Sequence, residues 1–149
     1  MISTKLDFSA LKTFAEDLNA LSKTQNRRVL NAATRAGASI ITKEAKQRAP
    51  VKTGKLRKNI VTLSAKGQGA YSSVSGVHIR GRNPRTGNSD NTMKADNPNN
   101  AFYWRFIEMG TSKKAAAPFI RPAFESKLPE AEEAVIVRAM AEIDKVFSK

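Results

Sequence analysis

The sequence predicts an α+β fold in which a small antiparallel sheet is packed by an N-terminal helical pair and a C-terminal helix. Apolar residues recur at helical spacing before residue 50 and again after residue 118. Between them, two short segments rich in β-branched residues flank a glycine-containing turn. A chain of 149 residues can bury one hydrophobic core, so a single domain over residues 1–149 is expected.

Two helices are expected before residue 50. Apolar side chains at helical spacing predict the first over about residues 9–22 and the second over about residues 24–48. Small residues at positions 32–38 would let another element approach the second helix closely. Ala49-Pro50 ends this helix, because proline disfavours the helical region for the residue before it.

The two strands are expected over residues 60–64 and 71–80, on either side of the turn Gly67-Gln68-Gly69. Residues 51–54 form a turn ahead of them, since they contain the pair Thr53-Gly54. Leu56 then lies on a short helical or extended piece. This order gives a small sheet that follows directly on the second helix.

A long polar loop, or arm, is predicted over residues 81–100, where Gly, Asn, Pro, Ser, Thr and Asp replace apolar residues. The aromatic block at residues 102–107 fits either a strand or a helix by its spacing. Residues 118–122 open the C-terminal helical region. Pro129 is expected at a break in that region or at a fresh first turn.

The net charge of +13 would attract nucleic acid or an acidic protein surface, over a range set by salt screening. Basic residues are densest between Lys43 and Lys58, where they face only Glu44. No helix-turn-helix, zinc-finger or RNA-binding signature accompanies them, so both kinds of partner stay open. The candidate contacts to DNA or to an acidic partner are Lys43, Lys46, Arg48, Lys52, Lys55, Lys58, Arg80, Arg82 and Arg85.

Enzyme activity is not expected. The chain has no cysteine, and its single histidine, His78, lies in a predicted strand. We find no paired carboxylates beside apolar residues, no phosphate-binding loop and no nucleophile elbow. The sequence therefore predicts no catalytic residue, no metal site and no cofactor. No segment approaches the roughly 20 apolar residues of a membrane span, and residues 1–7 lack a signal-peptide core, so neither a membrane partner nor secretion is expected.

Two sequence blocks resemble a known phage family. Residues 48–57, RAPVKTGKLR, resemble the pattern A-P-x-x-T-G-x-L-[RK]. Residues 102–111, FYWRFIEMGT, followed by residues 118–125, PFIRPAFE, resemble Y-A-x-Φ-Φ-E-Φ-G-T, a short loop and P-F-Φ-R-P-A, where Φ is apolar. This is the family of gene product 10 of the HK-type lambdoid phages, similar in role to the tail-completion protein Z of lambda. The departures are Trp104, where the family usually has a small residue, and the long arm.

The resemblance implies a structural virion protein that closes the tail and joins it to the head. Such a protein would form a homo-oligomeric ring, expected to be a hexamer, around the DNA passage. Its partners would be head connector or stopper proteins, the tail terminator or tail tube, and DNA in the channel. It would be assembled in the host cytoplasm and reside at the neck of the virion. The alternatives are a tail-terminator protein of the same structure and a basic nucleic-acid-binding protein.

Many of the matched residues are of shape-determining types, such as glycine at turns and proline before a helix. We expect the block at 102–111 and the basic turn at 50–58 to lie on or near contacts between subunits, and the arm to reach a neighbour or line the channel. The assembly candidates are Pro50, Thr53, Gly54, Leu56, Arg57, Phe102, Tyr103, Trp104, Phe106, Glu108, Gly110, Thr111, Pro118, Phe119, Arg121 and Pro122.

Overall fold

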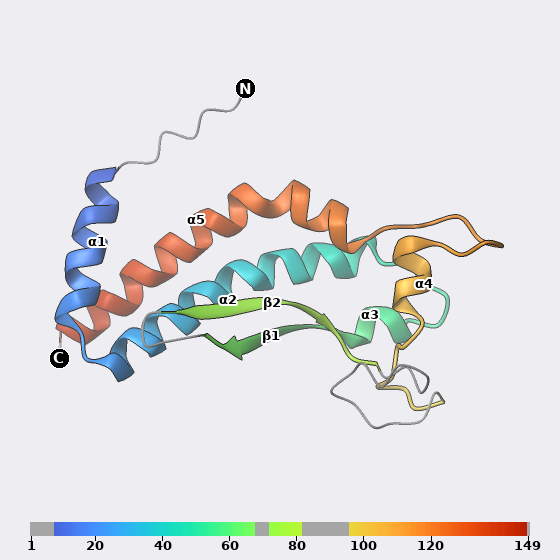
Figure 1. Cartoon of the computed structure of the whole chain (residues 1–149), viewed down its shortest axis with the longest axis horizontal. Coiled ribbons are helices and arrows are strands. Elements are labelled where there is room, and N and C mark those ends of the chain that lie inside the picture. Colours follow the sequence, from blue (N-terminus) through green and yellow to red (C-terminus); the bar gives the residue numbers. More distant parts are fainter. Residues whose placement is uncertain (1–7, 68–71, 82–95, 149) are drawn as a thin grey trace.

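The structure is a computed structural model that describes residues 8–67, 72–81 and 96–148. Helices and a two-stranded antiparallel sheet make up the described part, which confirms the α+β fold class (Figure 1). In chain order the elements are α1 (Phe8–Ala20), α2 (Lys23–Arg48), α3 (Lys55–Asn59), β1 (Ile60–Lys66), β2 (Ser73–Ile79), α4 (Trp104–Met109) and α5 (Ile120–Phe147).

Helix α2 is the central element, and its start is fixed by a capping box. The Ser22 hydroxyl accepts a hydrogen bond from the Gln25 N–H at 3.3 Å, and the Gln25 side chain accepts one from the Ser22 N–H at 3.0 Å. This reciprocal pair satisfies two N–H groups that have no partner within the helix. The two predicted N-terminal helices are confirmed, and each boundary lies within two residues of the prediction.

Helix α5 packs closely along α2 through small residues. A Cβ atom added at Gly37 would lie 2.6 Å from Val135 Cγ2 and 2.9 Å from the Ala131 carbonyl oxygen. Only glycine therefore fits at this helix contact. Ala33 of α2 and Ala139 of α5 are both buried in the same cluster. The prediction that small residues at 32–38 would admit another element is confirmed.

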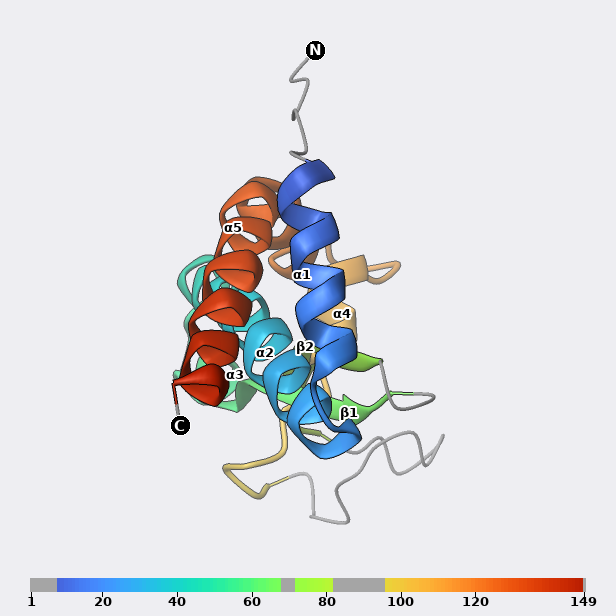
Figure 2. The same ribbon diagram turned by 90° about the vertical axis from the view of Figure 1, so that its left-hand side faces the viewer.

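The hairpin of β1 and β2 lies on the side of α2 opposite to α5, so α2 is the middle layer (Figure 2). Near the turn of the hairpin, its α2-facing side carries hydroxyl groups. Thr34 Oγ1 lies 3.0 Å from the hydroxyl oxygens of both Ser73 and Ser75. The outer side carries Leu63 and Val74, which are 48% and 58% exposed. Hydrogen bonds therefore hold this half of the hairpin to α2, and two aliphatic side chains face outward.

Both predicted strands are confirmed with small shifts. Strand β1 continues two residues beyond the predicted end at 64, and β2 begins at Ser73 rather than at 71. Residues 68–71, which include part of the predicted turn, lie outside the described residues. Ile60 pairs with Ile79 where the hairpin enters the core, and both side chains are buried.

The expected break at Pro129 is wrong, because α5 runs without interruption from Ile120 to Phe147. Proline removes one hydrogen bond from a helix and usually kinks or ends it. Here the Pro129 side chain is exposed, whereas Ala123 and Ala131 on either side of it are buried against the α2 face of the core. Packing on both sides of the proline keeps the helix continuous through it.

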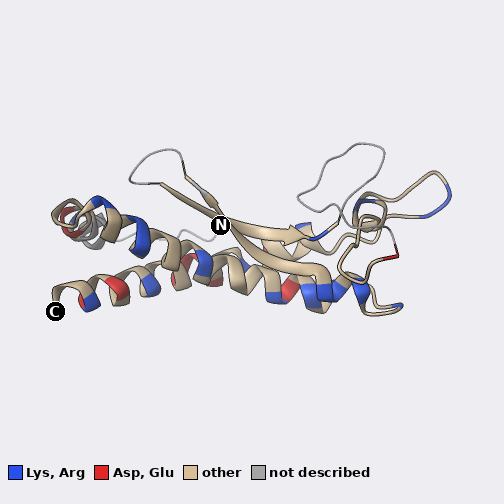
Figure 3. Cartoon of the chain, turned by 90° about the horizontal axis from the view of Figure 1, so that it is seen from below, with Lys and Arg blue, Asp and Glu red and all other residues tan. Residues whose placement is uncertain are grey.

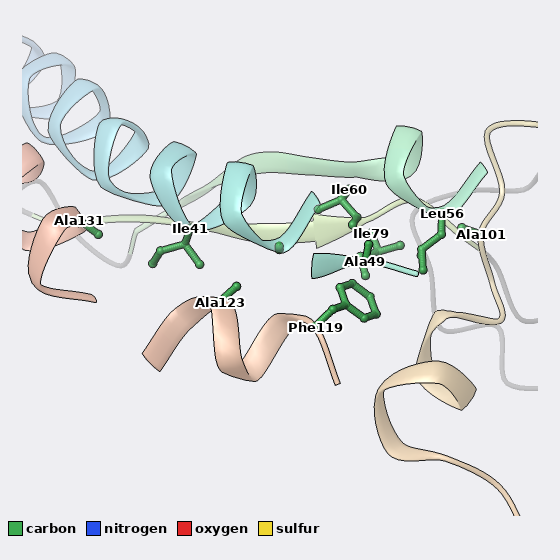
Figure 4. Close-up of a cluster of buried hydrophobic side chains, with 10 residues drawn as sticks. Ile41, Ala49, Leu56, Ile60, Ile79, Ala101, Phe119, Ala123 and Ala131 are labelled. Atoms are coloured by element: carbon green, nitrogen blue, oxygen red, sulfur yellow. The ribbon is translucent and has the colours of Figure 1, made fainter. Parts of the chain in front are cut away.

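The main core lies where α2, the hairpin, α3 and the start of α5 converge (Figure 4). Phe119 is fully buried at its centre, beside Leu56 of α3 and Ala49 at the end of α2. Burying a phenylalanine contributes roughly 1.5–3 kcal/mol to folding. This cluster fixes the end of the molecule at which the two sequence blocks lie.

Only the ends of the predicted arm are described, because residues 82–95 lie outside the described part. Its far end is anchored by Asn59, whose buried side-chain amide donates to the carbonyl oxygens of Lys55 and Pro98, each at 2.8 Å. The Ala101 N–H donates to the Arg80 carbonyl oxygen at 2.8 Å. The two ends of the arm therefore return to neighbouring points beside the core.

Candidate functional site

The two sequence blocks meet around a hollow of about 690 Å³ at the α3–α4 end of the molecule. We call it the motif hollow. Its wall combines the turn after α2 with α4 and the loop that follows α4. The lining residues are Pro50, Val51, Lys52, Thr53, Gly54, Lys55, Leu56, Tyr103, Phe106, Ile107, Thr111, Lys114, Ala115 and Ala117. Segments that lie about 50 positions apart in the sequence thus form one surface.

Glu108 of α4 caps the start of α5. Its Oε2 atom accepts hydrogen bonds from the N–H groups of Phe119 at 2.8 Å and Ile120 at 3.1 Å. Its Oε1 atom accepts one from the N–H of Arg121 at 3.1 Å. The first four N–H groups of a helix have no partner within it, and the fourth position here is Pro122, which has no N–H. One carboxylate and one proline therefore account for the whole N-terminus of α5.

This geometry gives a physical reason for the second sequence block. A carboxylate at the positive end of the helix macrodipole is favourable, so Glu108 serves both as hydrogen-bond acceptor and as counter-charge. Glu108 and Pro122 are both among the predicted assembly candidates, and the fold shows that they act together at one helix end. The signal was the spacing, a glutamate ending a short apolar segment shortly before a proline-rich helix start.

Gly110 shapes the loop between α4 and α5. Its backbone has φ 76° and ψ −179°, a region open essentially to glycine alone. A Cβ atom there would lie 2.8 Å from the Ala116 nitrogen. The loop closes on itself through hydrogen bonds between the backbones of Thr111 and Lys114, at 2.8 and 3.2 Å. Glycine at this position therefore ends α4 and turns the chain into the loop.

The first block contributes a left-handed turn and a cap for α2. Gly54 has φ 74° and ψ −7° as it begins α3, and Thr53 Oγ1 accepts a hydrogen bond from the Lys55 N–H at 3.4 Å. The Arg57 guanidinium donates to the carbonyl oxygens of Gln47 at 3.5 Å and Ala49 at 3.4 Å. A cation at these last carbonyls stabilises the C-terminus of α2.

The aromatic block forms helix α4, which decides between the strand and the helix that its spacing allowed. Tyr103 and Trp104 pack against the core, while Phe106 remains 51% exposed. Arg105 lies over the Trp104 ring, with Cζ 5.4 Å from its centroid, a cation–π contact. Partial burial raises the pKa of the Tyr103 hydroxyl. Phe102 packs edge-on to Tyr103, with the ring centroids 5.8 Å apart.

The assembly candidates thus divide by environment. Leu56 and Phe119 are core residues, so they cannot contact a partner directly. Pro50, Thr53, Thr111 and Pro118 are exposed. Arg121 is exposed as well, and its guanidinium pairs with Glu125 at 3.1 Å. Val51, which is 57% exposed, and Lys114 also line the motif hollow, although the sequence analysis did not select them.

The predicted basic residues crowd the end of the molecule where α2 leads into α3 (Figure 3). Arg48 is engaged within the chain, since its Nε atom lies 2.7 Å from Glu44 Oε1 and its Nη2 atom donates to Ser126. Arg82 and Arg85 lie outside the described residues. The side chains of Lys43, Lys52, Lys58 and Arg80 are exposed, and those of Lys46 and Lys55 are half-buried.

The described residues form no candidate metal site and no membrane-spanning helix. His78 is half-buried on β2, on the side of the hairpin that faces away from α2. No group of three or more His, Cys, Asp or Glu residues in the described part could hold a metal ion. None of the described helices is long and apolar enough to cross a membrane.

Several of the selected residues shape the chain around the motif hollow, since Glu108 caps α5 and Gly110 turns the loop that follows α4. The chain matches the family model described as "Bacteriophage HK97-gp10, putative tail-component" over residues 12–110, about two-thirds of its length. It belongs to this family, as its two sequence blocks indicated, and is a bacteriophage tail component found in the virion. The family is not a class of enzymes. No curated protein and no solved structure matches the chain.

Proposed function

We propose that this protein is a tail-completion or neck subunit that forms a ring where the phage head meets the tail. The observation that supports it most is the motif hollow, which a member of a tail-component family builds from both of its signature blocks. Exposed apolar and basic side chains surround this hollow, among them Val51, Phe106 and Lys52. Aromatic residues on a protein surface are enriched at interfaces between proteins.

A ring around the DNA passage requires heterologous contacts, in which one patch of each subunit meets a different patch of the next. Further contacts would be made above, to head connector or stopper proteins, and below, to the tail terminator or tail tube. The excess positive charge suits a surface near DNA, because exposed lysines attract the negatively charged phosphate backbone. The mechanism is binding and assembly, with no bond made or broken.

The experiment is electron microscopy of lysates from the parent phage with an early nonsense codon in this gene. Loss of a completion protein should leave DNA-filled heads and separate tails of normal length, and a plasmid copy of the gene should restore joined particles. Tails of uncontrolled length would indicate the tail-terminator role instead. Normal infectious virions without the protein would refute both roles.

A further inference from the structure

Besides the motif hollow, α5 presents a second surface that nothing in the described part of the chain covers. Glu130, Glu133, Val137, Met140 and Asp144 follow one another at steps of three and four residues, so they form one stripe along the helix. All five are exposed, with Val137 at 60% and Met140 at 40%. We call them the outer stripe of α5. It is apolar in the middle and acidic at both ends.

The outer stripe is acidic, whereas the chain as a whole has a net charge of +13. Five of the 13 acidic residues of the chain lie between Glu130 and Asp144, with Arg138 as the only basic residue among them. Some of these acids are engaged on α5 itself. Glu130 of the stripe pairs with Lys127 at 2.5 Å, and Glu142 pairs with Arg138 and Lys145, at 2.8 and 3.0 Å. Within the described residues, the carboxylates of Glu133 and Asp144 make no ion pair.

The motif hollow has the complementary character. Lys52 and Lys114 line it and are exposed, and neither makes an ion pair within the described part of the chain. Val51 and Phe106, beside them, are 57% and 51% exposed. The hollow is therefore apolar with basic side chains at its wall, which matches an apolar stripe with acidic ends.

The two surfaces lie at opposite ends of the molecule. Figure 1 places α3 and α4 at one end and the C-terminal half of α5 towards the other. A single copy cannot bring them together, whereas two copies arranged head to tail can. Copies that each carry a charge of +13 repel one another unless a local contact joins opposite charges. The outer stripe is the acidic, apolar surface that could supply such a contact.

We propose that the motif hollow of one copy receives the outer stripe of α5 from the next copy, and that this contact repeats around the ring. Val137 and Met140 enter the apolar part of the hollow, while Glu133 and Asp144 approach Lys52 and Lys114. The contact is heterologous, as a closed ring requires. This inference rests on the proposed function and adds to it the two surfaces that meet.

Cysteine cross-linking tests the contact directly, because the chain contains no cysteine of its own. The doubly substituted protein Thr111→Cys with Met140→Cys, supplied from a plasmid to the nonsense phage, is treated in isolated particles with a short bismaleimide. We expect a ladder of products above the dimer on a denaturing gel. The two single-cysteine variants should give only monomer, since a head-to-tail contact keeps like positions apart. No ladder from the double variant, or a cross-linked dimer from either single variant in comparable amount, would overturn the proposal.

Charge exchange gives a second, independent test. The pair Lys52→Glu with Lys114→Glu, and the pair Glu133→Lys with Asp144→Lys, should each lower complementation about tenfold or more, because like charges then face each other. Combining all four substitutions should restore a large part of that loss. Lys23→Glu, a charge reversal at an exposed residue far from the hollow, is the matched control and should complement normally. Thermal unfolding of each purified variant should match that of the wild type.

The outcomes separate the two proposals. If the combined variant is no better than either pair, the hollow and the stripe do not meet, although the neck role would stand on the nonsense phenotype. A cross-linked ladder in particles whose loss phenotype is not unjoined heads and tails would uphold the contact and overturn the neck role.

Discussion

The carboxylate of Glu108 caps α5, so we expect its removal to lower the stability of the folded chain. Replacing Glu108 with alanine removes the acceptor for three N–H groups, those of Phe119, Ile120 and Arg121. Loss of a helix cap costs about 0.5–2 kcal/mol, and loss of a charge-assisted hydrogen bond about 1.5–3 kcal/mol. Solvent can reach part of this helix end and replaces some of the lost bonds, so the contributions do not add fully. We expect a destabilisation of about 2–4 kcal/mol.

The assay is thermal unfolding of the purified protein, followed by far-ultraviolet circular dichroism. In a chain of this size each kcal/mol corresponds to roughly 2–4 °C, so the midpoint should fall by about 5–15 °C. Glu108→Gln retains a neutral acceptor oxygen and should cost about 1 kcal/mol. The control is Glu125→Ala, which removes an exposed carboxylate paired with Arg121 and should cost at most about 0.5 kcal/mol. Equal midpoints for Glu108→Ala and Glu125→Ala would refute the capping role.

The remaining predictions concern backbone conformation and pH. Gly54→Asn should cost about 1 kcal/mol or less in stability, since asparagine tolerates the left-handed region and no neighbour would meet the added Cβ atom. Gly110→Asn should cost about 3 kcal/mol or more, because its backbone region is open essentially to glycine alone and the added Cβ atom would meet the Ala116 nitrogen. Similar unfolding midpoints for the two variants would contradict this ordering. A hydrogen bond from the Lys145 ammonium lowers the pKa of the Glu142 carboxyl, and the positive charges of Lys145 and Arg138 lower it further. The ionised carboxylate of Glu142 therefore stabilises the fold. Because a depressed pKa contributes stability that is lost as pH falls through the folded value, Glu142→Gln should be less stable than wild type at pH 7, and the difference should vanish in acid. A difference in urea midpoint that stays constant from pH 7 to pH 3 would count against this pairing.

Free DNA provides a further test of the basic charge. If the exposed lysines only suit a surface near a channel, binding of the purified protein to short duplex DNA should be weak and should be lost between 50 and about 200 mM salt. Fluorescence anisotropy measures this directly. Tight binding at physiological salt with a steep logarithmic slope would favour the nucleic-acid-binding alternative.

Much of the fold follows from local patterns in the sequence. In α1, α2 and α5 the apolar residues recur every three or four positions, because one face of each helix packs on the core and the other faces solvent. The existence of these helices could therefore be predicted from the sequence. The spacing in residues 102–107 fits both strand and helix, and contacts with the core made it helix α4. Pro129 misled the prediction because a local rule favours a break, while the burial of Ala123 and Ala131 keeps α5 continuous.

The candidate site was less accessible to sequence analysis. The two blocks were each selected, but their meeting around the motif hollow depends on how Leu56 and Phe119 pack in the core. The spacing of residues within each block does not determine how far apart the two blocks lie in the fold or how they are oriented. Lys114 and the outer stripe of α5 carry no motif, and only their exposure in the folded chain draws attention to them. Whether the selected residues are assembly contacts stays a prediction.

Residues that shape the candidate surface and residues that would touch a neighbour should respond differently to mutation. Glu108 and Gly110 act inside the chain, by holding α5 and the loop that carries Lys114. Their substitution should lower thermal stability first, and any loss of assembly should follow from the displaced loop. Lys114→Glu changes only an exposed charge, so it should leave the unfolding midpoint unchanged and still reduce head–tail joining. If Lys114→Glu instead lowers stability as much as Glu108→Ala, the division between shaping and contacting residues fails at this surface.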